Sequence, residues 1–364
     1  QKLEIYAKLS REAELREEFK RGFENMGIEI HTKGLFRLLG APVGTRMHMV
    51  AVDGHLQAVV KKVTHFVGWI NQLNHTHARH LMLRYCGTTT LHHLARMVDP
   101  YLLRGFVGQP QDLLMDSLCL LLATDKLTPI QRSQACLPDN RGGLALVSAG
   151  QVLQAAYIGA AGDAARWYTT EKWLESVQLF RRLMNSNSVR VAVDEYNEYF
   201  VEHSANWRRK KPIIHLDPDV PQSWPRQRNL SQLVHDTRRD DLLEEMASLS
   251  DVGKAKQSAS LFSGLQLPYA GAWTRMIPTL PKHHVSSELF RAMVSTRLQV
   301  EISGSTHLER CACGQYEYAP YLRSGIHYHS QCNSLSYTTV VHNAVAECMR
   351  DAHRSANMIT QDQE

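Results

Sequence analysis

The feature that most constrains the fold is the spacing of apolar residues between positions 46 and about 128. Apolar side chains return every three or four residues there, which predicts amphipathic α-helices. One face carries Val59, Val63, Val67 and Ile70, and the pattern continues through Leu81, Leu83, Leu91 and Leu94. Another helix is indicated by Leu113, Leu114, Leu118, Leu121 and Leu122. Pro100 and Pro110 are expected to break the run, because proline cannot continue a helix interior.

Similar patterns fill most of the remaining chain. Residues 137 to 161 predict a Gly-Gly turn, a short strand or turn, and then a helix. Two amphipathic helices are expected over 171 to 204, and further helices over 230 to 262, 286 to 299 and 336 to 356, whereas 271 to 281 is expected to be a loop. The predicted class is therefore mainly α, with a small β element at the N-terminus.

That β element is predicted from alternation. Residues 2 to 9 alternate apolar and polar side chains, which favours a strand, and a helix is expected over 11 to 25. Ile28 and Ile30 begin a second strand, which turns at Lys33-Gly34 and continues to Gly40. The residues from Gly40 to Gly44 are expected to end it.

Bulk composition excludes some classes of protein. The 364 residues suggest two or three domains, and 43% apolar residues supply a sizeable core. The longest apolar run, residues 118 to 123, is too short for a membrane span, and the first residues do not resemble a signal peptide. Seven cysteines, four of them dispersed, favour an intracellular protein, nuclear or cytoplasmic. A net charge of +5 permits a nucleic-acid partner. We also expect the chain to be a piece of a longer protein.

A cluster of cysteine and histidine in "CACGQYEYAPYLRSGIHYHSQC", residues 311 to 332, has spacing suited to structural zinc. Cys311 and Cys313 form one pair, and Cys332 pairs with His327 or, alternatively, with His329. His342 is a further possible ligand or a histidine on a helix surface. The alternatives to zinc are a disulfide or buried thiols without metal. Four protein ligands would leave no open position for water, so the zinc would be structural.

No catalytic residues are identified. The phosphate-binding loop, the dinucleotide-binding glycine motif and the hydrolase nucleophile elbow are all missing from the sequence. Asp240-Asp241 is interpreted as acid at the start of a helix, where the helix dipole favours it, and the histidines of 75–80 and 91–94 as surface or packing residues.

Residues 205 to 229 contain four prolines and are the best candidate for a linker between domains. Within them, Arg208, Arg209, Lys210 and Lys211 follow Trp207. This run would suit phosphates and a stacked base. The alternatives are a solvated linker and a nuclear-targeting patch.

The order of the motifs carries a resemblance. "KLEIY", "GLFRLLGAPVGT" and "HARHLMLRYCGTTTLHHLARMVDP" come first, and "QRSQACLPDNRGGLALVSAGQVLQAAYIGA", "SGLQLPYAGAWTRMIP", "STRLQV" and the Cys/His cluster follow. This succession resembles the downstream part of reverse transcriptases of non-LTR retrotransposons, over roughly residues 1 to 350. The resemblance implies the end of a palm, a helical thumb, a connector and a Cys/Cys/His/Cys zinc knuckle.

The resemblance also implies roles for residues. Leu39, Gly40, Pro42 and Gly44 match the strand and turn near the primer terminus, and His342-Asn343 matches a motif that follows the knuckle. Val341 departs from the family, which usually has arginine there. The polymerase carboxylates of the family lie in a Tyr-x-Asp-Asp strand upstream of "KLEIY", and an endonuclease follows the knuckle in related elements, so neither active centre is expected within this chain.

A thumb holds a duplex through phosphate contacts, for which Arg79 and Arg84, with Arg96 and Arg104 beyond them, are candidates; the alternative is a solvated helix face. The expected units are a palm-like remnant (1–48), a thumb-like bundle and connector (49–204), a basic linker (205–229), a helical connector (230–304), a zinc-knuckle-like module (305–345) and a C-terminal helix and tail (346–364). The expected function is binding of element RNA and target DNA. The alternatives are a protein-interaction scaffold with structural zinc, and an unselected reading frame.

Overall fold

The computed structural model describes residues 4–5, 29–30, 35–38, 41–44, 49–170, 187–203, 214, 224–267, 270–277 and 285–302. Most of these residues are helical, which confirms the predicted mainly α class. None of the described helices is long and apolar enough to cross a membrane.

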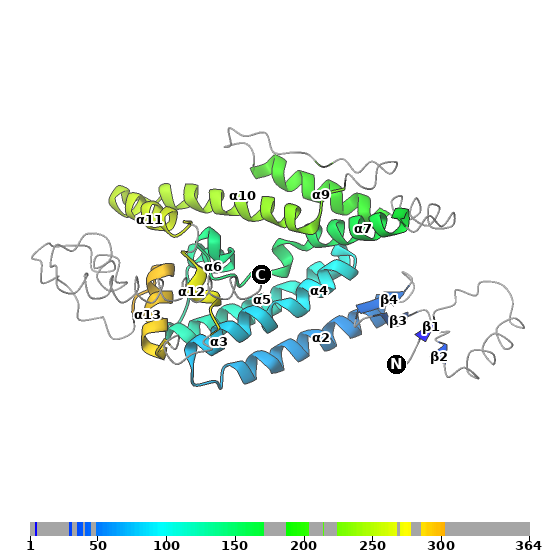
Figure 1. Cartoon of the computed structure of the whole chain (residues 1–364), viewed down its shortest axis with the longest axis horizontal. Helices are drawn as coiled ribbons and strands as arrows, with labels where there is room; N and C mark the ends of the chain where they lie inside the picture. The colour runs from blue at the N-terminus through cyan, green and yellow to red at the C-terminus, as the bar shows by residue number, and fades with distance from the viewer. Residues whose placement is uncertain are drawn as a thin grey trace, which may run out of the picture.

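The first half of the described chain forms one layer of helices. Its elements are α2 (Met49–Ile70), α3 (Thr76–Met82), the π-helix η2 (Leu83–Gly87), α4 (Thr89–Met97) and α5 (Pro100–Leu122). α2 lies along α5 at the edge of this layer (Figure 1). Leu56 of α2 packs in the same cluster as Leu103 of α5, whereas Ile70 packs in the same cluster as Leu122. The two helices therefore run side by side in the same direction.

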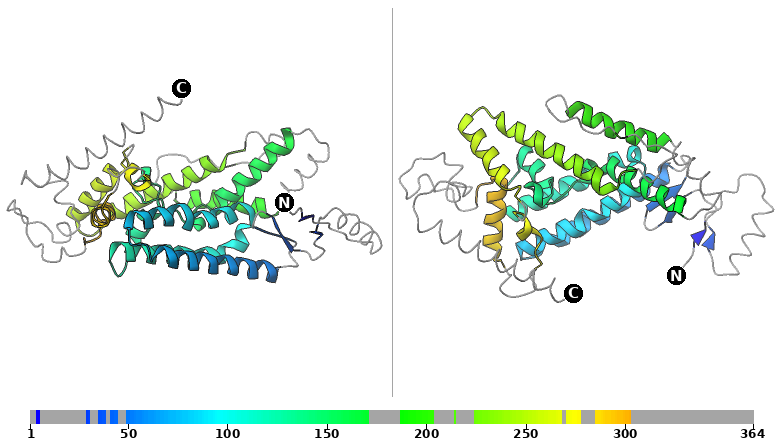
Figure 2. Two further views of the ribbon diagram at one scale, coloured as in Figure 1. Left: turned by 60° about the horizontal axis from the view of Figure 1, so that its bottom comes forward. Right: turned by 45° about the horizontal axis from the view of Figure 1, so that its top comes forward.

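The second half of the described chain contributes a further layer of helices and the short elements between the two layers. Its elements are α6 (Pro129–Cys136), the 3-10 turns η3 (Asp139–Arg141) and η4 (Ala149–Gln151), α7 (Leu153–Thr170), α9 (Asn187–His203), α10 (Gln227–Ala247), α11 (Val252–Gly264), α12 (Ala272–Arg275) and α13 (Ser287–Leu298). Figures 1 and 2 show α10 and α2 on opposite sides of α4 and α5. α2 is thus an outer helix with one face away from the core.

The described residues before Met49 form four short strands. β1 (Glu4–Ile5) pairs in parallel with β2 (Glu29–Ile30). β3 (Leu35–Leu38) pairs antiparallel with β4 (Ala41–Gly44), with Leu35 opposite Gly44 and Leu38 opposite Ala41. Residues 41 to 44, which we expected to end a strand, therefore form a strand themselves.

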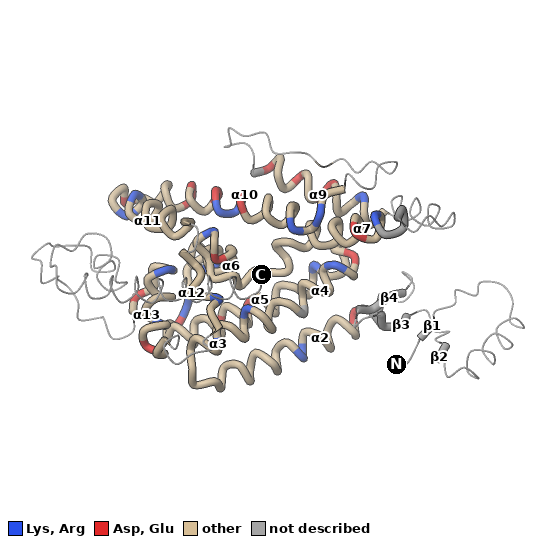
Figure 3. The backbone as a smooth tube through the Cα atoms, viewed as in Figure 1, with Lys and Arg blue, Asp and Glu red and all other residues tan. Residues whose placement is uncertain are grey.

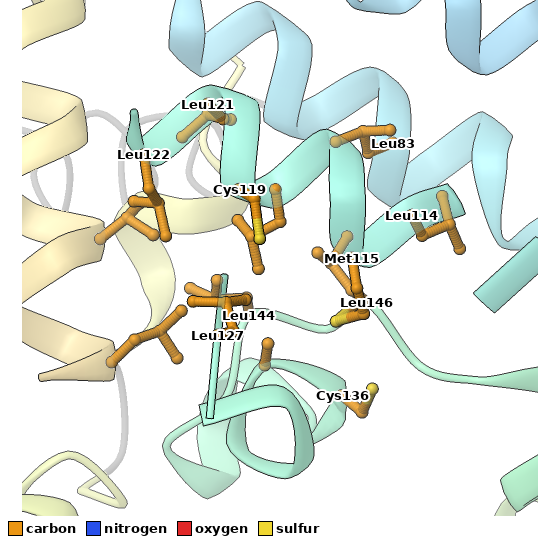
Figure 4. Packing of buried hydrophobic residues seen from close by; sticks show 14 of the residues in the cluster. Leu83, Leu114, Met115, Cys119, Leu121, Leu122, Leu127, Cys136, Leu144 and Leu146 are labelled. Carbon is orange, nitrogen blue, oxygen red and sulfur yellow. The ribbon is translucent and has the colours of Figure 1, made fainter. Parts of the chain in front are cut away.

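The largest core cluster surrounds the second half of α5, as Figure 4 shows. Leu114, Leu118, Leu121 and Leu122 are almost fully buried there, at the helical spacing that predicted this segment. Leu144 and Leu146 pack against them from the segment after η3. No strand forms in that segment, so the strand alternative for it is wrong.

The prediction about Pro110 is wrong. Pro100 begins α5, and Asp99 accepts a hydrogen bond from the amide of Tyr101, so the expected break at Pro100 is confirmed. Pro110, in contrast, lies buried inside α5. A proline has no amide hydrogen, so the carbonyl of Phe106 loses its usual helical donor. Burial of the apolar residues on both sides of Pro110 outweighs this local cost.

The range expected as a linker contains buried residues. Ile214 packs among α7, α9 and α10, and its amide and carbonyl are both bonded to the side chain of Asn197, at 2.9 and 3.0 Å. Trp224 is buried against Ala161 and Val189. α10 begins at Gln227, inside this range and two residues after Pro225.

Candidate nucleic-acid interface

The outer face of α2 carries a basic and aromatic set of side chains. Val60, Val63 and Val67 turn one side of the helix into the core. The opposite side therefore exposes Lys61, Lys62, His65 and Trp69, a set that we call the α2 face. Asp53 is the one acidic residue between Met49 and Ile70, so α2 shows blue but almost no red in Figure 3. The α2 face is positive and has no carboxylate of its own helix beside it.

Trp69 is unusual on this face because 61% of it is exposed. His65 lies one helical turn earlier, and the two rings are 4.9 Å apart between centroids, at 54°. An exposed indole beside lysines is a common way to stack a base while cations hold the phosphates.

A groove of about 630 Å³ runs between α2 and α5. Its walls are Gln57, Val60, Lys61, Thr64 and His65 of α2 together with Gly105, Phe106 and Gln109 of α5. Among these described residues the polar groups are amides, a hydroxyl, an imidazole and an ammonium, and none is acidic. The groove thus continues the α2 face inward, with hydrogen-bonding groups that suit a polar or anionic ligand.

A second polar centre is completely buried. Arg297 of α13 is 2% exposed, and its guanidinium donates to three backbone carbonyls: Gly143 at 2.9 Å, Ala270 at 2.9 Å and Asp139 at 2.5 Å. Burial lowers the pKa of Arg297 to about 10, an effect that Asp139 opposes and Arg84 adds to. The side chain is still charged at neutral pH, and its hydrogen bonds make burial of that charge tolerable.

The carboxylate of Asp139 gathers two more arginines at the same point. Arg84 lies 3.2 Å from it and also donates to Thr274 at 3.2 Å, while Arg275 lies 3.7 Å away. We call Asp139, Arg84, Arg275 and Arg297 the arginine node. It joins η2, η3, α12 and α13, and two of its members, Arg84 and Arg297, are 213 residues apart in the sequence (297 − 84).

Arg84 reaches the arginine node from the π-helix η2. The wider turn of a π-helix disturbs the regular i→i−4 hydrogen bonds. Thr88 donates to the carbonyl of Arg84 at 2.6 Å, and Thr89 to that of Tyr85 at 2.9 Å. Thr88 and Thr89 thereby supply donors to two carbonyls of this turn.

The arginines expected to bind nucleic acid are engaged within the protein. Arg79 donates to the carbonyls of Asn71 and Leu73, both at 2.8 Å, and Arg84 belongs to the arginine node. Arg96 forms an ion pair with Asp163 at 3.0 Å, and Arg104 forms one with Glu195 at 2.6 Å. These contacts stabilise the helical body.

Several other predicted residues lie outside the described residues. These are the zinc candidates Cys311, Cys313, His327, His329, Cys332 and His342, the basic run Arg208, Arg209, Lys210 and Lys211, and Leu39 and Gly40. Pro42 and Gly44 lie in β4. In the part of the chain that the structure describes, no group of three or more His, Cys, Asp or Glu residues is arranged to hold a metal ion.

The interpretation of Asp240-Asp241 as acid at a helix start is wrong. Both residues lie in the middle of α10, which begins at Gln227. Asp240 is buried and pairs with Arg239 at 2.5 Å. Asp241 instead lines a small cleft of about 150 Å³ beside Tyr199. The two carboxylates therefore make different contacts.

None of the residues predicted from the sequence belongs to the α2 face, that is, to Lys61, Lys62, His65 or Trp69. The available signal was the lysine pair next to an apolar helical stripe, with no acid in the sixteen residues after Gly54 and a tryptophan at the end. A solvated helix of an ordinary protein usually mixes both signs of charge.

No family model matches this chain, and neither a curated protein nor a solved structure matches it.

Proposed function

We propose that the chain binds RNA or DNA through the α2 face, as the nucleic-acid-holding part of a reverse transcriptase of the non-LTR retrotransposon type. The observation that carries the binding proposal is the exposure of Lys61, Lys62, His65 and Trp69 on one side of an outer helix without an acid among them. Lysines on such a face displace condensed counterions from phosphates, which drives association without sequence reading.

The arginine node supports the family part of the proposal. Three stretches carry the resemblance here, residues 131–160, 263–278 and 295–300, and each supplies a residue to the bonds of Arg297 with Asp139, Gly143 and Ala270. Residues of remote motifs that contact one another are expected when the motifs belong to one structural unit. The zinc knuckle at Cys311, Cys313, His327 and Cys332 remains part of the proposal, on the sequence alone.

A protein-interaction scaffold is the second candidate. It is favoured by apolar residues exposed on α5, where Tyr101 is 72% exposed and Leu120 is 60% exposed. A protein partner would cover such residues, whereas phosphates would not.

The test measures binding of a labelled 20-nucleotide RNA, a DNA of the same sequence and the corresponding duplexes at several salt concentrations. We compare Lys61→Gln/Lys62→Gln with Lys126→Gln/Lys256→Gln, which removes the same charge from exposed lysines elsewhere. Loss of two phosphate contacts should reduce the slope of log affinity against log salt by about two in the first variant. The control variant should keep the wild-type slope.

Two results would contradict the proposal. Equal losses in the two double variants would mean that net charge alone, and not the α2 face, determines binding. Failure of the wild-type chain to bind any of the four probes at low salt would leave the interaction scaffold as the better account.

A further inference from the structure

We propose that the groove between α2 and α5 receives an unpaired nucleobase, so that the α2 face prefers a single strand to a duplex. This inference rests on the proposed function and specifies the form of its ligand. Phosphate contacts to a duplex need only an open positive surface. A recess beside such a surface offers a place for a base that is free to turn outward, as a base of a single strand is.

The size of the recess fits this use. A volume of about 630 Å³ lies within the range of pockets that hold small organic ligands, about 300 to 1,000 Å³. In a duplex the bases are paired and stacked, so a duplex would have to open before one of its bases entered. A single strand pays much less to unstack one base.

The walls offer contacts to a base edge and to its faces. Gln57 and Gln109 come from the two opposite helices, and each amide carries both a donor and an acceptor. Phe106 supplies an aromatic ring. Thr64 donates its hydroxyl hydrogen to the carbonyl of Val60 at 3.0 Å, so its oxygen is left with lone pairs to accept.

Lys61 places the strand as well as the base. It belongs both to the groove wall and to the α2 face, so it can hold the phosphate next to an inserted base. The polar groups of the groove wall do not distinguish RNA from DNA by themselves, so both are included in the test.

The decisive variant fills the groove. A Cβ atom added at Gly105 meets no atom within 4 Å, and Gly105 lines the groove. Gly108 is the matched control: it lies three residues later in α5, is also exposed, also has no atom within 4 Å of an added Cβ, and is not among the residues of the groove wall. Leucine favours helix at both positions relative to glycine, so both variants should fold.

We expect Gly105→Leu to weaken binding of single-stranded RNA or DNA by about tenfold, the range of one lost stacked base, with duplex affinity unchanged. Gly108→Leu should change neither. Circular dichroism and the melting temperature of each variant establish that it is folded. A larger loss for RNA than for DNA would assign a contact to the ribose hydroxyl, and equal losses would assign the groove to the base alone; both outcomes support the inference.

The inference is overturned if Gly105→Leu and Gly108→Leu bind single strands equally well, or if the wild type binds duplex as tightly as single strand. These results differ from failure of the proposed function, in which Lys61→Gln/Lys62→Gln behaves like its control or the wild type binds no probe. The groove can therefore fail as a base-binding site while the α2 face still binds phosphates.

Discussion

Arg297 shows how much of the architecture depends on one side chain. Its planar guanidinium donates to three carbonyls at once, two from residues 139–143 and one from Ala270. A lysine at this position would present a compact ammonium whose three donors cannot match that fixed fork. The carbonyl of Arg297 itself accepts from Gln134 at 2.7 Å, so the residue is bonded through both its ends. Arginine is required here for geometry as much as for charge.

His80 makes the stability of the fold sensitive to acid. It is fully buried beside Phe290, with ring centroids 5.6 Å apart, and its ring nitrogens have no hydrogen-bond partner within the described part of the chain. Burial, together with repulsion from Arg84, His77 and Arg297, lowers its pKa to about 3. The ordinary imidazole pKa is about 6.5. Between these values the unfolded chain binds a proton that the folded chain excludes, so stability falls as pH falls.

We therefore expect His80→Leu to flatten the dependence of unfolding free energy on pH. Between pH 6 and 4, the unfolding free energy of the wild type should fall by up to about 1.4 kcal/mol per pH unit more than that of the variant. Above pH 7 this difference in slope should vanish. Urea unfolding of both proteins at a series of pH values measures these slopes. The same substitution at the exposed His65 is measured in parallel as the control for loss of an imidazole. Parallel curves for wild type and His80→Leu would contradict the assignment.

At the scale of elements, the sequence predicted helices well where one side of a helix is buried. The spacing of Val59, Val63, Val67 and Ile70 gave α2, and Ser286 with the apolar positions after it gave α13. The amphipathic pattern is a local signal, because each buried face repeats within a single helix. Pro110 and the pair Asp240-Asp241 were misjudged because tertiary packing, which the local pattern does not contain, outweighs local preference there.

The segment that links α6 to η4 depends on glycine at one position. A Cβ atom on Gly143 would lie 2.0 Å from the carbonyl oxygen of Leu137 and 2.6 Å from that of Gln134. Both neighbours are backbone atoms, which cannot move aside as the end of a side chain can. The Gly-Gly turn was predicted from sequence, but the reason for its second glycine is this close approach of two backbones.

Gly143→Ala should lower the unfolding free energy by about 2 kcal/mol or more, the usual range for overpacking a tight site. Gly68→Ala is the contrasting change: Gly68 lies exposed within α2, where an added Cβ meets nothing within 4 Å. Alanine should stabilise that helix by about 0.5–1 kcal/mol. Thermal unfolding of the two variants measures both effects, and equal shifts in melting temperature would mean that the close approach at Gly143 does not matter.

At the scale of the whole molecule, the candidate interface and the arginine node differ in how far the sequence reveals them. The α2 face belongs to one helix, so its charge pattern is readable in a single stretch. The arginine node brings together Arg84, Asp139 and Arg297, and nothing local to any of them indicates the other two. The ordered motifs supplied the segments, but only the tertiary structure shows that their charged residues meet inside the protein.

The zinc prediction concerns residues 311 to 332, which lie outside the described residues. Cys311 and Cys313 with a later histidine and Cys332 should bind one zinc ion per chain, since four such ligands suit a closed tetrahedral site. Elemental analysis of the reduced, purified chain should find one zinc, and Cys311→Ser/Cys313→Ser should find none. Cys86→Ser, a partly buried thiol of η2, is the control and should keep the metal.

The choice between His327 and His329 is decided by comparing their alanine variants in the same assay. Replacement of the true ligand should lower the zinc content or increase the loss of zinc to a chelator, whereas replacement of the other histidine should leave both as in the wild type. Chelation should leave the far-ultraviolet dichroism of α2 to α13 nearly unchanged, because the arginine node and the apolar clusters that hold these helices together need no metal. A collapse of helicity on chelation would instead make zinc a support of the helical body, and zinc in the double cysteine variant would remove this ligand set altogether.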